Sequence, residues 1–212
     1  MDTAAVPEAL QGISLFPVSL LGILCVKPRE REIMHNKIIL NLAISLDGYI
    51  ADANGGYEWI RPSGDHTLNT RTVWSHADFL EHVAAVVMGK RSYDQQLHVE
   101  YGQKQVYVAT SESLEDYYNI HFIGRDVCSE VAALKRRLDG DVYLFGGGIT
   151  IDPLLKAQMI DEYSIGIIPI ILGEGIPLFL QDNPTIPLYL TNYYVEDGVV
   201  VMRYVPRKDV DG

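Results

Sequence analysis

The feature that most constrains the fold of this chain is a series of short apolar segments, each followed by glycine or by small polar residues. Residues 84–88 (AAVVM) precede Gly89, residues 105–109 (QVYVA) precede Thr110, and residues 141–145 (DVYLF) precede three glycines. Apolar runs of this length without polar alternation are typical of strands that are buried on both faces of a sheet. The segments therefore predict the centre of a parallel β-sheet.

Helical patterns separate several of these strands. Residues 126–138 predict a helix that ends before Gly140, with one apolar stripe formed by Val127, Val131, Leu134 and Leu138. Ser75 and Asp78 have the spacing of a capping box, so a helix is expected to begin there. The remaining predicted elements are a helix through Leu154, Leu155 and Met159 and strands at 37–45, 120–123 and 162–172. Strands that alternate with helices predict an α/β domain with a mainly parallel sheet.

The C-terminal region adds antiparallel strands to this sheet. Residues 188–195 and 199–205 flank Glu196-Asp197-Gly198, which is a strong hairpin signal. Residues 52–65, in contrast, carry three glycines and Pro62 and show no periodicity, which predicts a long loop. Loops of this length often carry function.

Polar residues follow three of the predicted parallel strands. Lys90, Arg91 and Ser92 follow one strand, Thr110 and Ser111 another, and Gly146-Gly147-Gly148 a third. Ligands of open parallel sheets lie outside the carboxyl ends of the strands, so these residues are expected to line one crevice. Glycines at a helix start and a cationic pair together favour a phosphate-bearing ligand. The alternatives are a turn that needs space and an ordinary solvated pair of cations.

Composition excludes several classes of function. The chain of 212 residues has 28 acidic and 17 basic side chains and a net charge of −11, which disfavours binding to a nucleic-acid backbone. Cys25 and Cys128 form no Cys-x-x-Cys pair, so we expect no structural zinc and a reducing, cytoplasmic compartment. The histidines show no metal-ligand spacing and are expected to be structural or exposed; they are His35, His66, His76, His82, His98 and His121.

The N-terminal region does not fit the predicted domain. Residues 9–26 contain no charged side chain, which approaches the length of a membrane span, but Pro17 and polar residues interrupt the run. A secretory signal begins with a basic region, whereas this chain has Asp2 and Glu8 there, which argues against such a signal. We expect residues 1–33 to be an extension, disordered or upstream of a start at Met34, with a membrane anchor as the alternative. The predicted domain is then 34–212.

Motifs along this domain resemble the dihydrofolate reductase superfamily. The order of motifs is NLAISLDGYIA, Trp59, VVMGKRSYD, VYVATS and YLFGGG. The segment GGGITIDPLLKAQMIDEYSIGIIPIILGEGIPLF is more similar to the reductase domain of riboflavin biosynthesis and its single-domain relatives. The resemblance implies a dihydrofolate reductase-like three-layer α/β fold, binding of NADPH, reduction of a small-molecule substrate and, by analogy, a homodimer.

The resemblance also implies roles for individual residues. It implies contacts with the cofactor phosphates at Gly89, Lys90, Arg91, Ser92, Thr110, Ser111, Gly146, Gly147, Gly148, Ile149 and Thr150. It implies contacts with the nicotinamide at Ala43, Ser45, Ile50 and Phe145, with the substrate under the 52–65 loop. Dihydrofolate reductases carry a carboxylate shortly after a Trp-x-x-Pro sequence, so Asp65 is a candidate proton donor, with Asp47 and Glu58 as competitors.

The chain departs from the riboflavin reductases at positions that concern the substrate. Phe145 stands where those reductases usually carry glutamate, and residues 94–105 lack their stretch that grips a substrate phosphate. We therefore expect an NADPH-dependent reductase of a heterocyclic or carbonyl substrate. The alternative is a nucleotide-binding module that has lost turnover.

Overall fold

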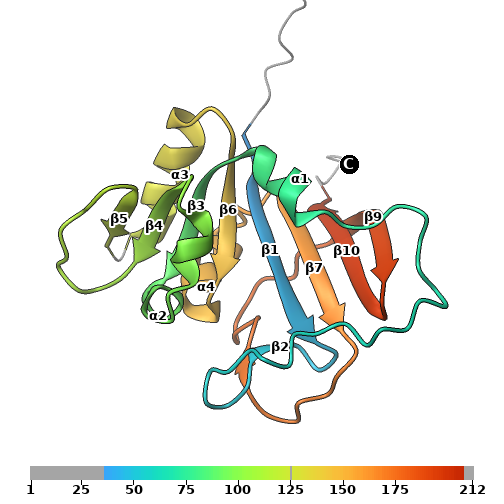
Figure 1. Ribbon diagram of the computed structural model, residues 1–212. Helices are drawn as coiled ribbons and strands as arrows, with labels where there is room; N and C mark the ends of the chain where they lie inside the picture. Colours follow the sequence, from blue (N-terminus) through green and yellow to red (C-terminus); the bar gives the residue numbers. More distant parts are fainter. Residues whose placement is uncertain (1–35, 125, 208–212) are drawn as a thin grey trace, which may run out of the picture. The chain divides into compact units, whose positions relative to one another are not determined.

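The computed structural model describes residues 36–124 and 126–207, so the predicted extension 1–33 and its uncharged run lie outside the described residues. The described residues form an eight-stranded sheet in the order β5-β4-β3-β6-β1-β7-β10-β9 (Figure 1). Its strands are β1 (Ile38–Ser45), β3 (Val83–Gly89), β4 (Gln105–Ala109), β5 (Ile120–Ile123), β6 (Asp141–Gly146), β7 (Glu162–Ile168), β9 (Leu188–Glu196) and β10 (Val199–Pro206).

The sheet is parallel except at its C-terminal edge. Strands β5, β4, β3, β6, β1 and β7 run parallel to one another, whereas β10 pairs antiparallel with β7 and β9 pairs antiparallel with β10. This arrangement confirms the predicted mainly parallel α/β sheet with a closing hairpin.

Three strands differ from the predicted pattern. The strand predicted at 162–172 ends at Ile168, because Pro169 follows and has no amide to continue the ladder. A separate two-stranded sheet pairs β2 (Tyr49–Ala51) with β8 (Ile176–Pro177), which the sequence pattern did not predict.

Helices cover both faces of the sheet. They are α1 (His76–Glu81), α2 (Lys90–Asp94), the 3₁₀ helix η1 (Leu97–Tyr101), α3 (Val127–Arg137) and α4 (Gly148–Lys156). Helices α3 and α4 bury Val131 and Leu154 in a core that includes Leu40 of β1. Phe79 of α1 and Tyr101 of η1 pack against a second core on the opposite face. The three-layer arrangement is therefore confirmed. None of these helices is long and apolar enough to cross a membrane.

Charged side chains fix the amino ends of the central strands. The carboxylate of Glu162 is 4% exposed and accepts hydrogen bonds from Lys37 Nζ (3.0 Å) and Arg203 Nε (2.7 Å). Asp161 accepts from the Ile38 amide at 2.7 Å, and Asp141 accepts from the Lys37 amide at the same distance. Burial raises the pKa of Asp141. These bonds hold the register of β1 between β6 and β7 at the edge opposite the cavity described below.

Candidate functional site

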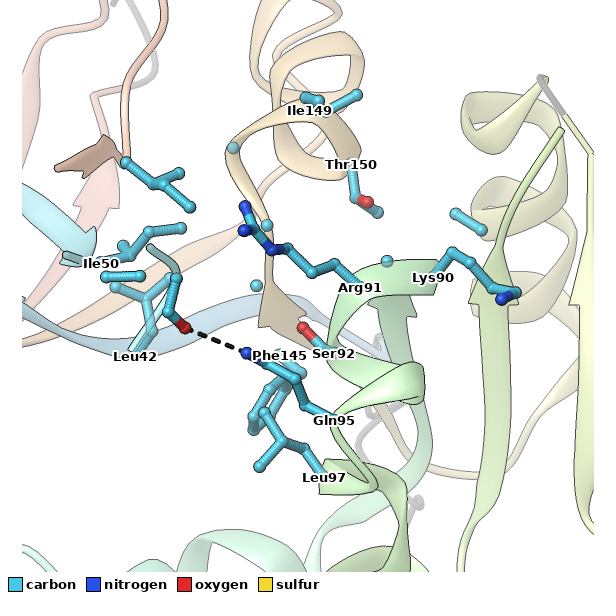
Figure 2. A pocket seen from close by; sticks show the side chains of 18 of the residues that line it. Leu42, Ile50, Lys90, Arg91, Ser92, Gln95, Leu97, Phe145, Ile149 and Thr150 are labelled. Atoms are coloured by element: carbon cyan, nitrogen blue, oxygen red, sulfur yellow. Dashed lines mark hydrogen bonds between the residues drawn. The ribbon is translucent and has the colours of Figure 1, made fainter. Parts of the chain in front are cut away.

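A cavity of about 680 Å³ lies at the carboxyl ends of the parallel strands. Strands β4, β3, β6 and β1 are consecutive neighbours in the sheet, so the segments that follow them meet at one edge. Figure 2 shows Ile149 and Thr150 at one end of the cavity and Leu97 and Phe145 at the other. We call the first the glycine end, which comprises residues 89–92, 110–112 and 146–150. The second is the aromatic end, which comprises His76, Leu97, Glu100, Tyr101, Tyr143 and Phe145.

The start of α4 presents backbone rather than side chains to the glycine end. Gly147 is the N-cap with φ +92°, and no side chain caps the helix. This left-handed backbone favours glycine because a Cβ would strain it. A Cβ on Gly148 would lie 2.8 Å from the Pro177 carbonyl oxygen, so that residue packs directly on β8. The first turn of α4 therefore leaves space for an anion. Its backbone amides and the positive end of the helix dipole would attract the anion.

The start of α2 supplies the cations of the glycine end. Figure 2 shows Lys90 and Arg91 extending in opposite directions from the helix start. Lys90 Nζ lies 2.7 Å from Asp94 Oδ1 and 3.7 Å from Glu112 Oε2. The hydrogen bond to Asp94 raises the pKa of Lys90, so the ammonium group stays charged. Its charge is shared between two carboxylates, one of which lines the cavity.

A tight turn at residues 52–56 closes the cavity opposite α2. Asp52 Oδ1 accepts from the amides of Asn54 and Gly56, both at 2.8 Å, and these bonds lower the pKa of Asp52. Gln95 Nε2 donates to the Gly55 carbonyl at 3.0 Å, as the dashed line in Figure 2 shows. Arg91 Nη2 donates to the Asn54 carbonyl at 3.3 Å. The turn and α2 are thus tied together across the cavity.

Packed rings form the aromatic end. The ring of Phe145 lies 5.6 Å from that of Tyr101 and 5.9 Å from that of Tyr143. His76 meets both tyrosines edge-on, at 6.5 and 6.3 Å between centroids. His76 is exposed, as expected, and it also lines the cavity, which the sequence did not indicate. The sequence signalled only that a helix begins beside it, at Ser75.

The structure brings most of the predicted cofactor residues together. Those that line the cavity are Ala43, Ile50, Gly89, Lys90, Arg91, Ser92, Thr110, Ser111, Phe145, Gly146, Gly147, Gly148, Ile149 and Thr150. Ser45 is not among them. It is fully buried, and its hydroxyl accepts from the Tyr49 amide at 3.0 Å, so it orders the turn that leads to Ile50.

The three carboxylates considered as proton donors do not line the cavity. Asp47 accepts from the Gly173 amide at 2.8 Å, and hydrogen bonds from Ser45 and from backbone amides lower its pKa. Asp65 is exposed and accepts from the Thr67 hydroxyl at 2.6 Å, which lowers its pKa. Glu58 is also exposed. Within residues 36–124 and 126–207, no group of three or more His, Cys, Asp or Glu side chains could hold a metal ion.

Comparisons with known proteins identify relatives of this chain and of its fold. The Bacillus subtilis protein YwjB is 32% identical over 158 residues, which cover 69% of this chain and 84% of YwjB. A putative riboflavin biosynthesis protein from Shewanella sp. PV-4 is 27% identical, with a TM-score of 0.68 over 81% of this chain and 99% of that one.

Dihydrofolate reductase from Enterococcus faecalis, in a complex with NADP(H), is 14% identical and has a TM-score of 0.57, covering 82% of this chain and 98% of that one. This likeness confirms the predicted dihydrofolate reductase-like fold. The model of the RibD C-terminal domain matches residues 65–196, which span β3 to β9 and most of the cavity lining. The chain belongs to the RibD C-terminal domain family.

Proposed function

We propose that the protein is an NADPH-dependent reductase of a small heterocyclic or carbonyl substrate. One observation carries the proposal: the uncapped start of α4 and the cationic start of α2 line the same cavity. The family and the fold support a reductase, and the shape of the glycine end supports a phosphate-bearing cofactor.

The residues of the glycine end fit a dinucleotide. A Cβ on Gly89 would approach Thr150 Oγ1 to 2.8 Å, so glycine here keeps the crevice between β3 and α4 open. Amides at the start of α4 and the guanidinium of Arg91 would hold the phosphates, because both groups donate to anionic oxygens. Ala43, Ile50 and Phe145 would hold the nicotinamide against an apolar wall.

The chain's own residues would position the reactants and limit access of water. The bound reduced nicotinamide would supply the hydride, which is chemistry that the protein itself lacks. Phe145 lies at the border between the proposed nicotinamide wall and the aromatic end, so a substrate there would adjoin the cofactor. The turn at residues 52–56, tied to α2, would cover the reacting groups.

Binding and turnover test this proposal separately. Isothermal titration with NADPH and NADH measures cofactor binding. The loss of dihydronicotinamide absorbance with pterin, pyrimidine and dicarbonyl acceptors measures turnover. Saturable NADPH binding with turnover of at least one acceptor is expected. Binding without turnover over the whole panel would instead identify a nucleotide-binding module, and absence of binding would contradict both.

We propose that Lys90, a charged residue of the glycine end, contacts the additional phosphate that distinguishes NADPH from NADH. Lys90→Ala is expected to weaken NADPH binding about ten- to a hundredfold, because a hydrogen bond to a charged phosphate contributes about 1.5–3 kcal/mol. NADH lacks the extra phosphate, and its affinity should change little. The dissociation constants of both cofactors, measured by titration, check this expectation.

Glu112→Gln is the matched variant. It removes the carboxylate that lies 3.7 Å from Lys90 Nζ and competes with a phosphate for that cation. NADPH binding should therefore become several-fold tighter, about threefold for a partly exposed charge. An equal effect of either substitution on NADH would show that Lys90 does not contact the additional phosphate.

A further inference from the structure

The charged side chains that line the cavity are distributed unevenly between its two ends. Of the described residues that line it, the lysine and the arginine both lie at the glycine end, on the first turn of α2. The aromatic end contains one carboxylate, that of Glu100 on η1. A phosphate on a substrate in the aromatic end would therefore face a carboxylate with neither cation beside it.

The remaining polar groups of the aromatic end are uncharged at neutral pH. Burial raises the pKa of Tyr101 to about 12 and that of Tyr143 well above its ordinary value, so both hydroxyls stay protonated. Desolvation against these rings lowers the pKa of His76, although Glu100 opposes that shift. The imidazole is therefore mainly neutral and does not offset the charge of Glu100.

The packing of the aromatic end also restricts the shape of its ligand. Tyr101 is 2% exposed and Tyr143 is 3% exposed, and they pack at 81° to each other with 5.8 Å between their centroids. Phe145 contacts both rings and is partly exposed toward the cavity. The accessible ring of Phe145, held in place by the two buried tyrosines, favours a flat ligand, because an aromatic group packs on such a ring with little loss of conformational freedom.

We propose that the aromatic end binds a planar ring that bears no phosphate and no other negative charge. This inference rests on the proposed function for the identity of the ring as the hydride acceptor. The binding preference itself does not depend on a cofactor. The substrate class therefore differs from the phosphate-bearing uracil in the name of a solved bifunctional reductase of the same fold, from Thermotoga maritima, which is 19% identical to this chain and has a TM-score of 0.59.

A matched pair of fluorescent probes tests the inference without cofactor. Binding of 2-naphthol and 2-naphthyl phosphate to the full chain is measured by probe fluorescence, with excess inorganic pyrophosphate present to occupy the glycine end. We expect 2-naphthol to bind about tenfold more tightly than 2-naphthyl phosphate, because one exposed carboxylate several ångströms away repels the phosphate by an energy of that size.

Glu100→Gln provides the control because it removes the charge at nearly constant shape and at an exposed position. The preference for 2-naphthol should fall by about threefold or more in this variant. Equal or tighter binding of 2-naphthyl phosphate would overturn the inference, as would an unchanged preference in Glu100→Gln or failure of both probes to bind. Since no nicotinamide is present, failure of the proposed reductase function would leave this result unaffected.

Discussion

Ile149→Asp is expected to raise the dissociation constant for NADPH about a hundredfold while the protein remains folded. Ile149 is 85% exposed at the second position of α4 and lines the glycine end. A carboxylate there would lie beside the proposed phosphates. Two like charges about 5 Å apart in an effective dielectric of about 20 repel by roughly 3 kcal/mol.

The fold should tolerate this substitution well. An acidic residue in the first turn of a helix stabilises it by about 0.3–1 kcal/mol through the helix dipole. Thermal unfolding should therefore show an equal or slightly higher Tm, while isothermal titration shows the loss of binding.

Ile149→Asn is the matched control because asparagine has the shape of aspartate without its charge. It should lose only the packing of the isoleucine side chain and bind NADPH far more tightly than the aspartate variant. If both variants bind NADPH equally well, the phosphates do not lie at the start of α4.

Of the substitutions proposed for this protein, Glu162→Gln is expected to lower the free energy of unfolding the most. The glutamine could not balance the charges of Lys37 and Arg203, which both contact the buried carboxylate. We expect the free energy of unfolding to fall by about 2–3 kcal/mol, less than the roughly 3–5 kcal/mol of a fully buried pair because both cations reach solvent. Urea denaturation monitored by circular dichroism measures the change.

Lys156→Gln serves as the comparison for this stability measurement. It breaks the ion pair of Lys156 with Asp152, one turn apart on α4, in which the Lys156 side chain is 41% exposed. Pairs of this kind contribute about 0.3–0.5 kcal/mol. A loss in Glu162→Gln no larger than that in Lys156→Gln would mean that the buried carboxylate does not stabilise the strand ends.

Much of the fold followed from local pattern, because apolar runs and glycine stops fix strand limits without knowledge of distant contacts. β4 and β5 begin and end at the predicted residues. β2 and β8 were not predicted because strands of three and two residues are too short to show a hydrophobic period. Their pairing also joins segments far apart in the chain.

The path of the long loop after β2 could not be predicted for a related reason. The Ser63 amide donates to the Asp197 carbonyl at 2.8 Å, and Asn69 exchanges hydrogen bonds with Asp197. These contacts with the β9–β10 turn hold the neighbouring Asp65 away from the cavity lining. The loop then leads into α1, which brings His76 to the aromatic end. Neither the contacts of the loop with Asp197 nor the approach of His76 to the aromatic end has a local signal in the sequence.

The turn at residues 52–56 has a kinetic consequence. Two hydrogen bonds, from Gln95 to Gly55 and from Arg91 to Asn54, join it to α2. The bond from Gln95 contributes about 0.5–1.5 kcal/mol and the charge-assisted bond from Arg91 about 1.5–3 kcal/mol, so the separated arrangement is populated roughly 3% of the time or less. A bulky ligand could therefore enter or leave when these two hydrogen bonds break, without unfolding of the sheet or of α2.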